Sequence, residues 1–119
     1  IVLLMFGTSF AVGKGRHRYG VEAPAVTGHP VFERLYRVQM NTLEWAAMCL
    51  PCLWICAAYV SDAVAAGLGA VWLVGRVWYA VGYAKEPALR AGGFIVAALA
   101  FGALGLAAGG GVVWRLLGA

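Results

Sequence analysis

The chain has 119 residues, of which 63% are hydrophobic and 12% are charged, and its formal net charge is +4. Soluble domains carry about 25% charged residues, so this composition excludes a soluble enzyme. It predicts an all-α integral membrane protein that folds as one domain over residues 1–119, and we expect no nucleic-acid partner.

Four apolar runs predict a bundle of four transmembrane helices. The first run covers residues 1–12 and is shorter than the ~20 residues that a span needs, so we expect the N-terminal end of this helix to be missing from the sequence. A polar loop over residues 13–31 follows, and the second span then covers residues 32–60. A very short turn leads to the third span, at residues 63–84, so these two spans should form a tight antiparallel hairpin.

Pro87 should stop or kink the chain after the third span, because proline removes a helical hydrogen bond and clashes with the preceding turn. The fourth span covers residues 93–117 and is rich in glycine and alanine. Within it, Gly105 and Gly109 form a small-xxx-small pair that would let another helix approach closely. The pattern leaves open whether that helix belongs to the same subunit or to a neighbour.

Basic residues gather at one end of the predicted spans, and the positive-inside rule places that end in the cytoplasm. The richness in alanine, glycine and valine favours a bacterial inner membrane, whereas in a eukaryote the membrane would be the endoplasmic reticulum or nuclear envelope. The basic residues concerned are Lys14, Arg16, Arg18, Arg34, Arg37, Lys85 and Arg90.

Three cysteines, Cys49, Cys52 and Cys56, lie at helical spacing within the apolar second span. A zinc site would need histidine or aspartate partners nearby, and the sequence offers none at suitable positions. We therefore expect these thiols to pack as small apolar side chains, and we predict no metal site.

The second span begins with a polar stripe. Arg34, Arg37, Asn41 and Glu44 are spaced at i, i+3, i+7 and i+10, which places them on one face of a helix. Gln39 points in almost the opposite direction. Placing charges inside a membrane segment is energetically costly, so such charges mark a binding site or an interface by default. Because the stripe and Gln39 lie on different faces, we expect this helix to contact two neighbours.

The third span carries a second polar stripe, in which Arg76, Tyr79 and Tyr83 share one face. Glu86 and Arg90 continue the stripe if the helix survives the intervening proline. Adjacent antiparallel helices would bring the two stripes together near the cytoplasmic end.

The alternative reading of these residues is structural. A buried ion pair between Arg76 and Glu44 would then account for both charges, with Arg34 in a similar structural role. The tyrosines would be interfacial aromatics, which favour that depth of a membrane.

A lining with several fixed cations, one carboxylate and several neutral hydrogen-bonding groups complements a small zwitterion with more than one carboxylate and one ammonium. Glutathione has two carboxylates, one ammonium, two amides and a thiol. A guanidinium beside that thiol would favour the thiolate and so activate it. A lipid phosphate head group would also suit the cations, but it gives the carboxylate less to bind.

Two long motifs resemble the MAPEG family, the membrane-associated proteins of eicosanoid and glutathione metabolism. They are FERLYRVQMNTLEW at residues 32–45 and GRVWYAVGYAKEPALR at residues 75–90, in the family's order and spacing. The resemblance runs from about residue 15 to the end of the fourth span. It implies a homotrimer of four-helix subunits with glutathione bound at the subunit interfaces.

The resemblance also implies roles for single residues. Arg90 matches the arginine that stabilises the glutathione thiolate, and it is our expected catalytic residue. Gln39 and Arg90 match positions that reach the site from the neighbouring subunit, and Arg16 matches a first-loop arginine that contacts glutathione. The positions that hold glutathione within one subunit are matched by Arg37, Asn41, Glu44, Tyr79 and Tyr83.

The function implied is that of a glutathione transferase or peroxidase, with a hydrophobic electrophile or lipid hydroperoxide arriving from the bilayer. Two departures bear on the substrate: Trp45 stands where the family often has tyrosine or phenylalanine, and His17 stands where leukotriene-forming members have arginine. The alternatives are a non-catalytic lipid-binding member of the family and a small four-span multidrug transporter. Neither alternative needs the full set of arginines and tyrosines.

Overall fold

The structure is a computed structural model, and it describes residues 1–118. Four helices follow one another along the chain, and no strand occurs in this part of it. Three segments are long and apolar enough to cross a membrane, namely α2, α3 and the stretch from η1 to the end of α4. The elements are α1 (Val2–Tyr19), α2 (Pro30–Tyr59), α3 (Asp62–Lys85), the short 3₁₀ helix η1 (Pro87–Leu89) and α4 (Arg90–Leu116).

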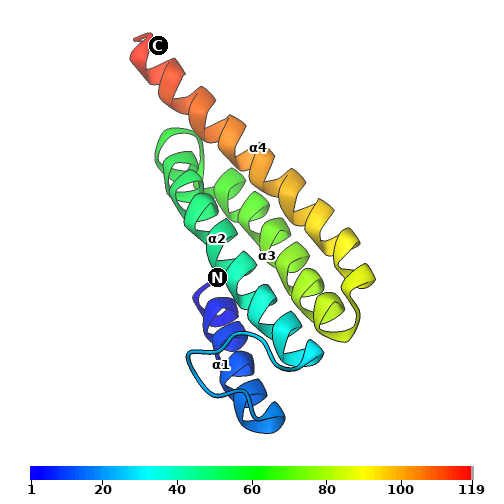
Figure 1. Cartoon of the computed structure of the whole chain (residues 1–119). Coiled ribbons are helices and arrows are strands. Elements are labelled where there is room, and N and C mark those ends of the chain that lie inside the picture. The colour runs from blue at the N-terminus through cyan, green and yellow to red at the C-terminus, as the bar shows by residue number, and fades with distance from the viewer. Residues whose placement is uncertain (119) are drawn as a thin grey trace.

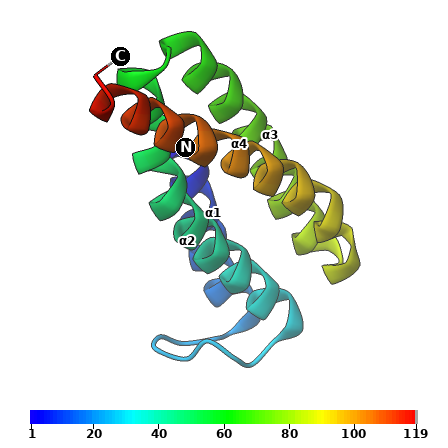
Figure 2. The ribbon, with the colours of Figure 1, turned by 90° about the horizontal axis from the view of Figure 1, so that it is seen from above.

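Helices α3 and α4 pack side by side and make the most extensive contact, whereas α2 packs against both near the turn into α3 and diverges from them toward its N-terminal end (Figures 1 and 2). Helix α1 packs against α2 and lies beside its first half only. The start of α1 reaches the middle of α2, where Met5 and Thr8 face Gln39 and Leu43. The result is an elongated molecule whose extents are 58 × 26 × 18 Å.

Helix α1 is longer than the apolar run at residues 1–12 predicts, and the expected loop at residues 13–31 shrinks accordingly to residues 20–29. The helix continues because Gly15 packs on α2, where an added Cβ would meet the side chain of Leu35 at 3.0 Å. Basic residues in the last turn also favour a helix C-terminus. Gly20 ends the helix with a left-handed backbone, at φ 67°.

Side-chain caps set the bounds of α2 and α3. His29 precedes α2, and its Nδ1 accepts a hydrogen bond from the Val31 backbone N–H at 3.1 Å. Ser61 precedes α3, and its hydroxyl oxygen accepts bonds from the first free backbone N–H groups, at 3.1 Å for Ala63 and 3.4 Å for Val64. The turn between these helices is therefore only two residues long, which confirms the tight hairpin expected there.

Close approach of α3 and α4 depends on Gly75 and Gly93. A Cβ at Gly75 would lie 2.7 Å from the Ala97 backbone nitrogen, and a Cβ at Gly93 would collide with the Tyr79 backbone nitrogen. The glycine pair singled out in the sequence behaves differently, because a Cβ at Gly105 or Gly109 meets nothing within 4 Å. That pair therefore mediates no close helix contact within the described chain.

The apolar core lies between α2, α3 and α4, toward the end of the molecule where α2 meets α3. Cys49, Cys56, Trp72 and Leu104 are fully buried there, with alanines filling the remaining space. Two of the three cysteines thus pack in the core as expected. Large apolar side chains such as Trp54 and Leu106 point outward, as they do in a helix bundle that faces lipid.

Candidate functional site

The three long helices line an open cleft of about 540 Å³ near the turn from α3 into α4. Four of the residues predicted from the sequence line it, namely Arg37 and Asn41 from α2, Tyr83 from α3 and Arg90 from α4. Small-molecule sites in proteins usually measure ~300–1,000 Å³. The cleft therefore has a size suited to a small ligand and a lining with two guanidinium groups.

Arg90 reaches this cleft because the chain turns at Pro87. Helix α3 ends at Lys85, η1 reverses the chain, and Arg90 begins α4. The guanidinium carbon of Arg90 lies 5.2 Å from the centre of the Tyr83 ring, a cation–π contact between the two helices. The turn places Arg90 in the same cleft as Arg37 of its own chain, and the contact with a neighbouring subunit that the resemblance implies for Arg90 stays a prediction.

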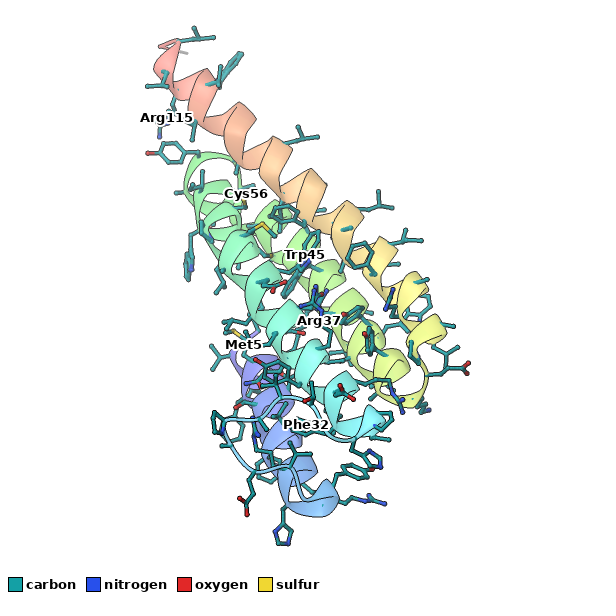
Figure 3. The ribbon with its side chains drawn as sticks, in the orientation of Figure 1. Met5, Phe32, Arg37, Trp45, Cys56 and Arg115 are labelled. Carbon is teal, nitrogen blue, oxygen red and sulfur yellow. The ribbon has the colours of Figure 1, made fainter. Side chains whose placement is uncertain are left out.

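Arg37 also forms an ion pair with Glu44, two turns further along α2. The Nη1 of Arg37 and Oε1 of Glu44 are 3.7 Å apart, and about half of each side chain is exposed. The ion pair that the sequence suggested between Arg76 and Glu44 is wrong, because the carboxylate turns toward Arg37 on its own helix. Figure 3 shows Arg37 near the middle of the molecule and Arg115 near the C-terminal end of α4.

Arg76 is fully buried between α2 and α3. Its Nη2 donates to Asn41 Oδ1 and to Thr42 Oγ1, at 3.0 Å each. Its guanidinium carbon lies 4.1 Å from the centre of the Tyr79 ring. Tyr79 in turn lies 5.6 Å from Tyr83, ring centre to ring centre. Arg76, Tyr79 and Tyr83 therefore form a continuous row of side chains from the buried guanidinium to the cleft.

Gln39 and Arg16 lie outside the cleft. Gln39 faces α1, as its helical angle predicts, and it lines a small cavity of about 50 Å³ with Thr8. The Nη1 of Arg16 donates to the Ala25 carbonyl at 2.7 Å and more weakly to the Val21 carbonyl at 3.4 Å. Arg16 therefore holds the loop between α1 and α2 within this chain.

Arg34 also does not line the cleft, although it shares the first stripe. Its Nε is buried and lacks a hydrogen-bond partner among the described residues. The first stripe therefore contributes Arg37 and Asn41 to the cleft, whereas Arg34, one turn earlier on α2, lies outside it. Arg34 forms no ion pair with another residue among residues 1–118, so the structural role expected for it does not come from such a pair.

Phe94 is a cleft residue that the sequence reasoning missed. It lies one turn after Arg90, so the i, i+4 spacing on α4 could have identified it. Its ring makes an edge contact with Trp45, at 5.4 Å between ring centres, and lies 6.4 Å from Tyr79. Trp45 thus packs α2 against α4 behind the cleft, where a smaller phenol ring would fill less space.

The cleft combines a cationic lining with an apolar wall. Arg37 and Arg90 supply fixed positive charge, and Phe94 and Ile95 supply apolar surface. Glu44 does not line the cleft, but its carboxylate lies 3.7 Å from the Arg37 guanidinium. Such a lining can bind an anion or a zwitterion and can stabilise negative charge that develops on it. The same wall gives an apolar molecule a surface beside the charged ligand.

Comparison with known proteins gives consistent matches. Residues 1–110 match the model of the MAPEG family. An uncharacterised protein of Synechocystis sp. is 47% identical over 105 residues, which cover 88% of this chain and 77% of that relative. Microsomal glutathione S-transferase 2 of Homo sapiens is 41% identical over 102 residues, covering 81% of this chain and 69% of the relative. Leukotriene C4 synthase of Cavia porcellus is 39% identical over 89 residues, and the match covers 75% of this chain and 59% of that enzyme.

Proposed function

Because this chain belongs to the MAPEG family, we propose that it is a membrane glutathione transferase whose site is the cleft of Arg37, Asn41, Tyr83 and Arg90. The observation that carries the proposal is that cleft: residues far apart in the sequence, each matched to a glutathione position of the family, line one hollow. Relatives named for glutathione transfer and for leukotriene C4 synthesis support the same class of activity.

In this proposal the ion pair of Arg37 and Glu44 is the first contact of the ligand. The γ-glutamyl end of glutathione carries one carboxylate and one ammonium on the same carbon. On binding, the carboxylate takes the place of Glu44 beside Arg37, and the ammonium takes the place of Arg37 beside Glu44. The pair is accessible for this exchange, because its side chains are 54% and 52% exposed.

Arg90 then supplies the chemical step. Its guanidinium stabilises the thiolate of bound glutathione, which lowers the pKa of that thiol and raises the population of the nucleophile. The thiolate sulfur attacks an electrophilic carbon and forms a carbon–sulfur bond, while the leaving group departs with its electron pair. Tyr83 holds Arg90 in place through the ring contact at 5.2 Å.

The second substrate in this proposal is a hydrophobic electrophile that enters from the bilayer. Ile95 and Phe94 form the apolar side of the cleft, and both side chains are more than a third exposed. An apolar molecule could therefore reach the sulfur without crossing the charged lining. Reduction of a lipid hydroperoxide would use the same thiolate, with a second glutathione completing the disulfide.

The proposed assembly is a homotrimer of subunits with four membrane-crossing helices and with the site toward the cytoplasm. Two features of the single chain support an assembly. Gln39 faces away from the cleft of its own chain, and Gly105 and Gly109 keep an open face on α4. A neighbouring subunit that packs on that face of α4 would bury the two glycines.

Calorimetric titration of the purified protein with glutathione tests the proposal, alongside turnover of a chlorodinitrobenzene as a model electrophile. We expect saturable binding that Arg37→Ala weakens by about tenfold or more, because a charge-assisted hydrogen bond contributes about 1.5–3 kcal/mol. Lys14→Ala is the matched control, since it removes an exposed cation from α1. Absence of glutathione binding by the unaltered protein would contradict the proposed function.

A further inference from the structure

Arg76 is a buried cation without an acidic partner among the described residues. None of its side chain is exposed, and its two hydrogen-bond acceptors are neutral oxygens, on Asn41 and Thr42. Its Nε and Nη1 have no hydrogen-bond partner among residues 1–118. A charge buried this way opposes stability, so its presence between two membrane helices calls for a role other than holding them together.

The contact with Asn41 fixes the orientation of the amide. A guanidinium can donate hydrogen bonds but cannot accept them, so the atom of Asn41 that faces Arg76 must be the carbonyl oxygen. That bond is 3.0 Å long. The amide nitrogen must then point away from Arg76, and Asn41 lines the cleft on its other side.

We propose that Arg76 is a positioning residue, which locks the Asn41 amide so that its NH₂ group donates into the cleft to an acceptor oxygen of glutathione. The inference rests on the proposed function for its ligand. The second bond, to Thr42 one residue further along α2, keeps the guanidinium from rotating with the amide. Arg76 itself lies behind Asn41 and does not touch the ligand.

The same guanidinium also supports Tyr79. Its carbon lies 4.1 Å from the centre of the Tyr79 ring, and Tyr79 is 3% exposed. Arg76 therefore braces two elements of the site, the amide on α2 and the first ring of the row that leads to Tyr83. Without Arg76, the amide could turn its carbonyl oxygen toward the cleft, where it would repel a carboxylate.

A double-mutant cycle tests the inference, with glutathione affinity and thermal stability measured for Arg76→Met, Asn41→Ala and the combined variant. We expect each single substitution to weaken glutathione binding about tenfold, and the double variant to be no weaker than the stronger single one. If the two losses multiply to about a hundredfold, the residues act independently and the inference is wrong.

Two further variants keep the result interpretable. Arg76→Lys retains a cationic donor, and we expect it to recover part of the affinity that Arg76→Met loses; the same affinity for both variants would contradict the inference. Trp72→Phe is the matched control, because Trp72 lies one turn earlier on α3 and is equally buried. It should lower the unfolding temperature without changing glutathione affinity.

The cycle also separates this inference from the proposed function. If the unaltered protein binds no glutathione, the proposed function fails, while coupling of Arg76 and Asn41 in the unfolding temperature still tests the bond between them. If the unaltered protein binds glutathione and the cycle is additive, only the positioning role is lost. Should Arg76→Met fail to fold, Arg76→Lys with Asn41→Ala completes the cycle with the same expected non-additivity.

Discussion

The two ends of the helix bundle use the same three helices with different side chains. At the polar end, where α3 turns into α4, Arg37 and Arg90 line the cleft and Glu44 pairs with Arg37, so these three charges do not balance. At the packed end, where α2 meets α3, cysteines, alanines and Leu104 fill the space without charge. The packed end therefore holds the apolar core, and the polar end exposes charged side chains as a binding surface.

Arg90 and Arg115 make the comparison sharp, because both lie on α4 at opposite ends of the bundle. We expect Arg90→Ala to lower kcat for the model electrophile by about 100- to 1,000-fold, as loss of a donor to a developing anion does. Arg115→Ala should leave turnover unchanged. Steady-state kinetics with saturating glutathione checks both, and undiminished turnover by Arg90→Ala would remove the proposed thiolate role.

Glu44 is the only acidic group paired at the polar end among the described residues. Glu44→Gln should weaken glutathione binding by about 1.5–3 kcal/mol, because the ligand ammonium loses its charged partner. An analogue without that ammonium should bind the variant and the unaltered protein equally well. Titration calorimetry measures both ligands, with Glu33→Gln on the first turn of α2 as the control. Equal losses for the two ligands would contradict the assignment.

Gly93 tests where the helices approach most closely. Gly93→Ala should reduce the free energy of unfolding by about 1–3 kcal/mol, since a Cβ there overpacks against Tyr79 and the Gly75 carbonyl oxygen. Gly105→Ala should be tolerated within the subunit. Thermal unfolding followed by circular dichroism in detergent compares the two, and equal destabilisation would show that Gly105 also meets a helix, in a neighbouring subunit.

Tyr83 gives the smallest expected effect. Tyr83→Leu removes the ring beneath Arg90, and a cation–π contact at a partly exposed site contributes about 0.5–1 kcal/mol, so kcat should fall only a few-fold. Tyr83→Phe keeps the ring, so its kcat should stay above that of Tyr83→Leu. If the phenylalanine and leucine variants have the same kcat, the hydroxyl rather than the ring supports the reaction.

The helices and much of the site followed from the sequence because both depend on periodicity. The i, i+3, i+7 spacing placed Arg37 and Asn41 on one face, and the same rule turned Gln39 away from them. The proline at 87 predicted the break before α4. The MAPEG resemblance, which the family match confirms, named four of the residues that line the cleft.

What the sequence missed depends on contacts between helices. The pairing of Glu44 with Arg37 rather than Arg76, and the choice of Gly93 over Gly105 for close approach, are decided by how helices rotate against one another. The extension of α1 to Tyr19 was missed because a run of glycine and basic residues reads as a loop, whereas contact of Gly15 with α2 makes it a helix. Periodicity within one helix carries no information on such contacts.

The most direct test of the account is the ultraviolet absorption of the glutathione thiolate on titration into the purified protein at neutral pH. We expect a saturable thiolate band for the unaltered protein, and loss of that band in Arg90→Ala while glutathione still binds. Binding without a thiolate band in the unaltered protein, or a band that Arg90→Ala leaves intact, would contradict it.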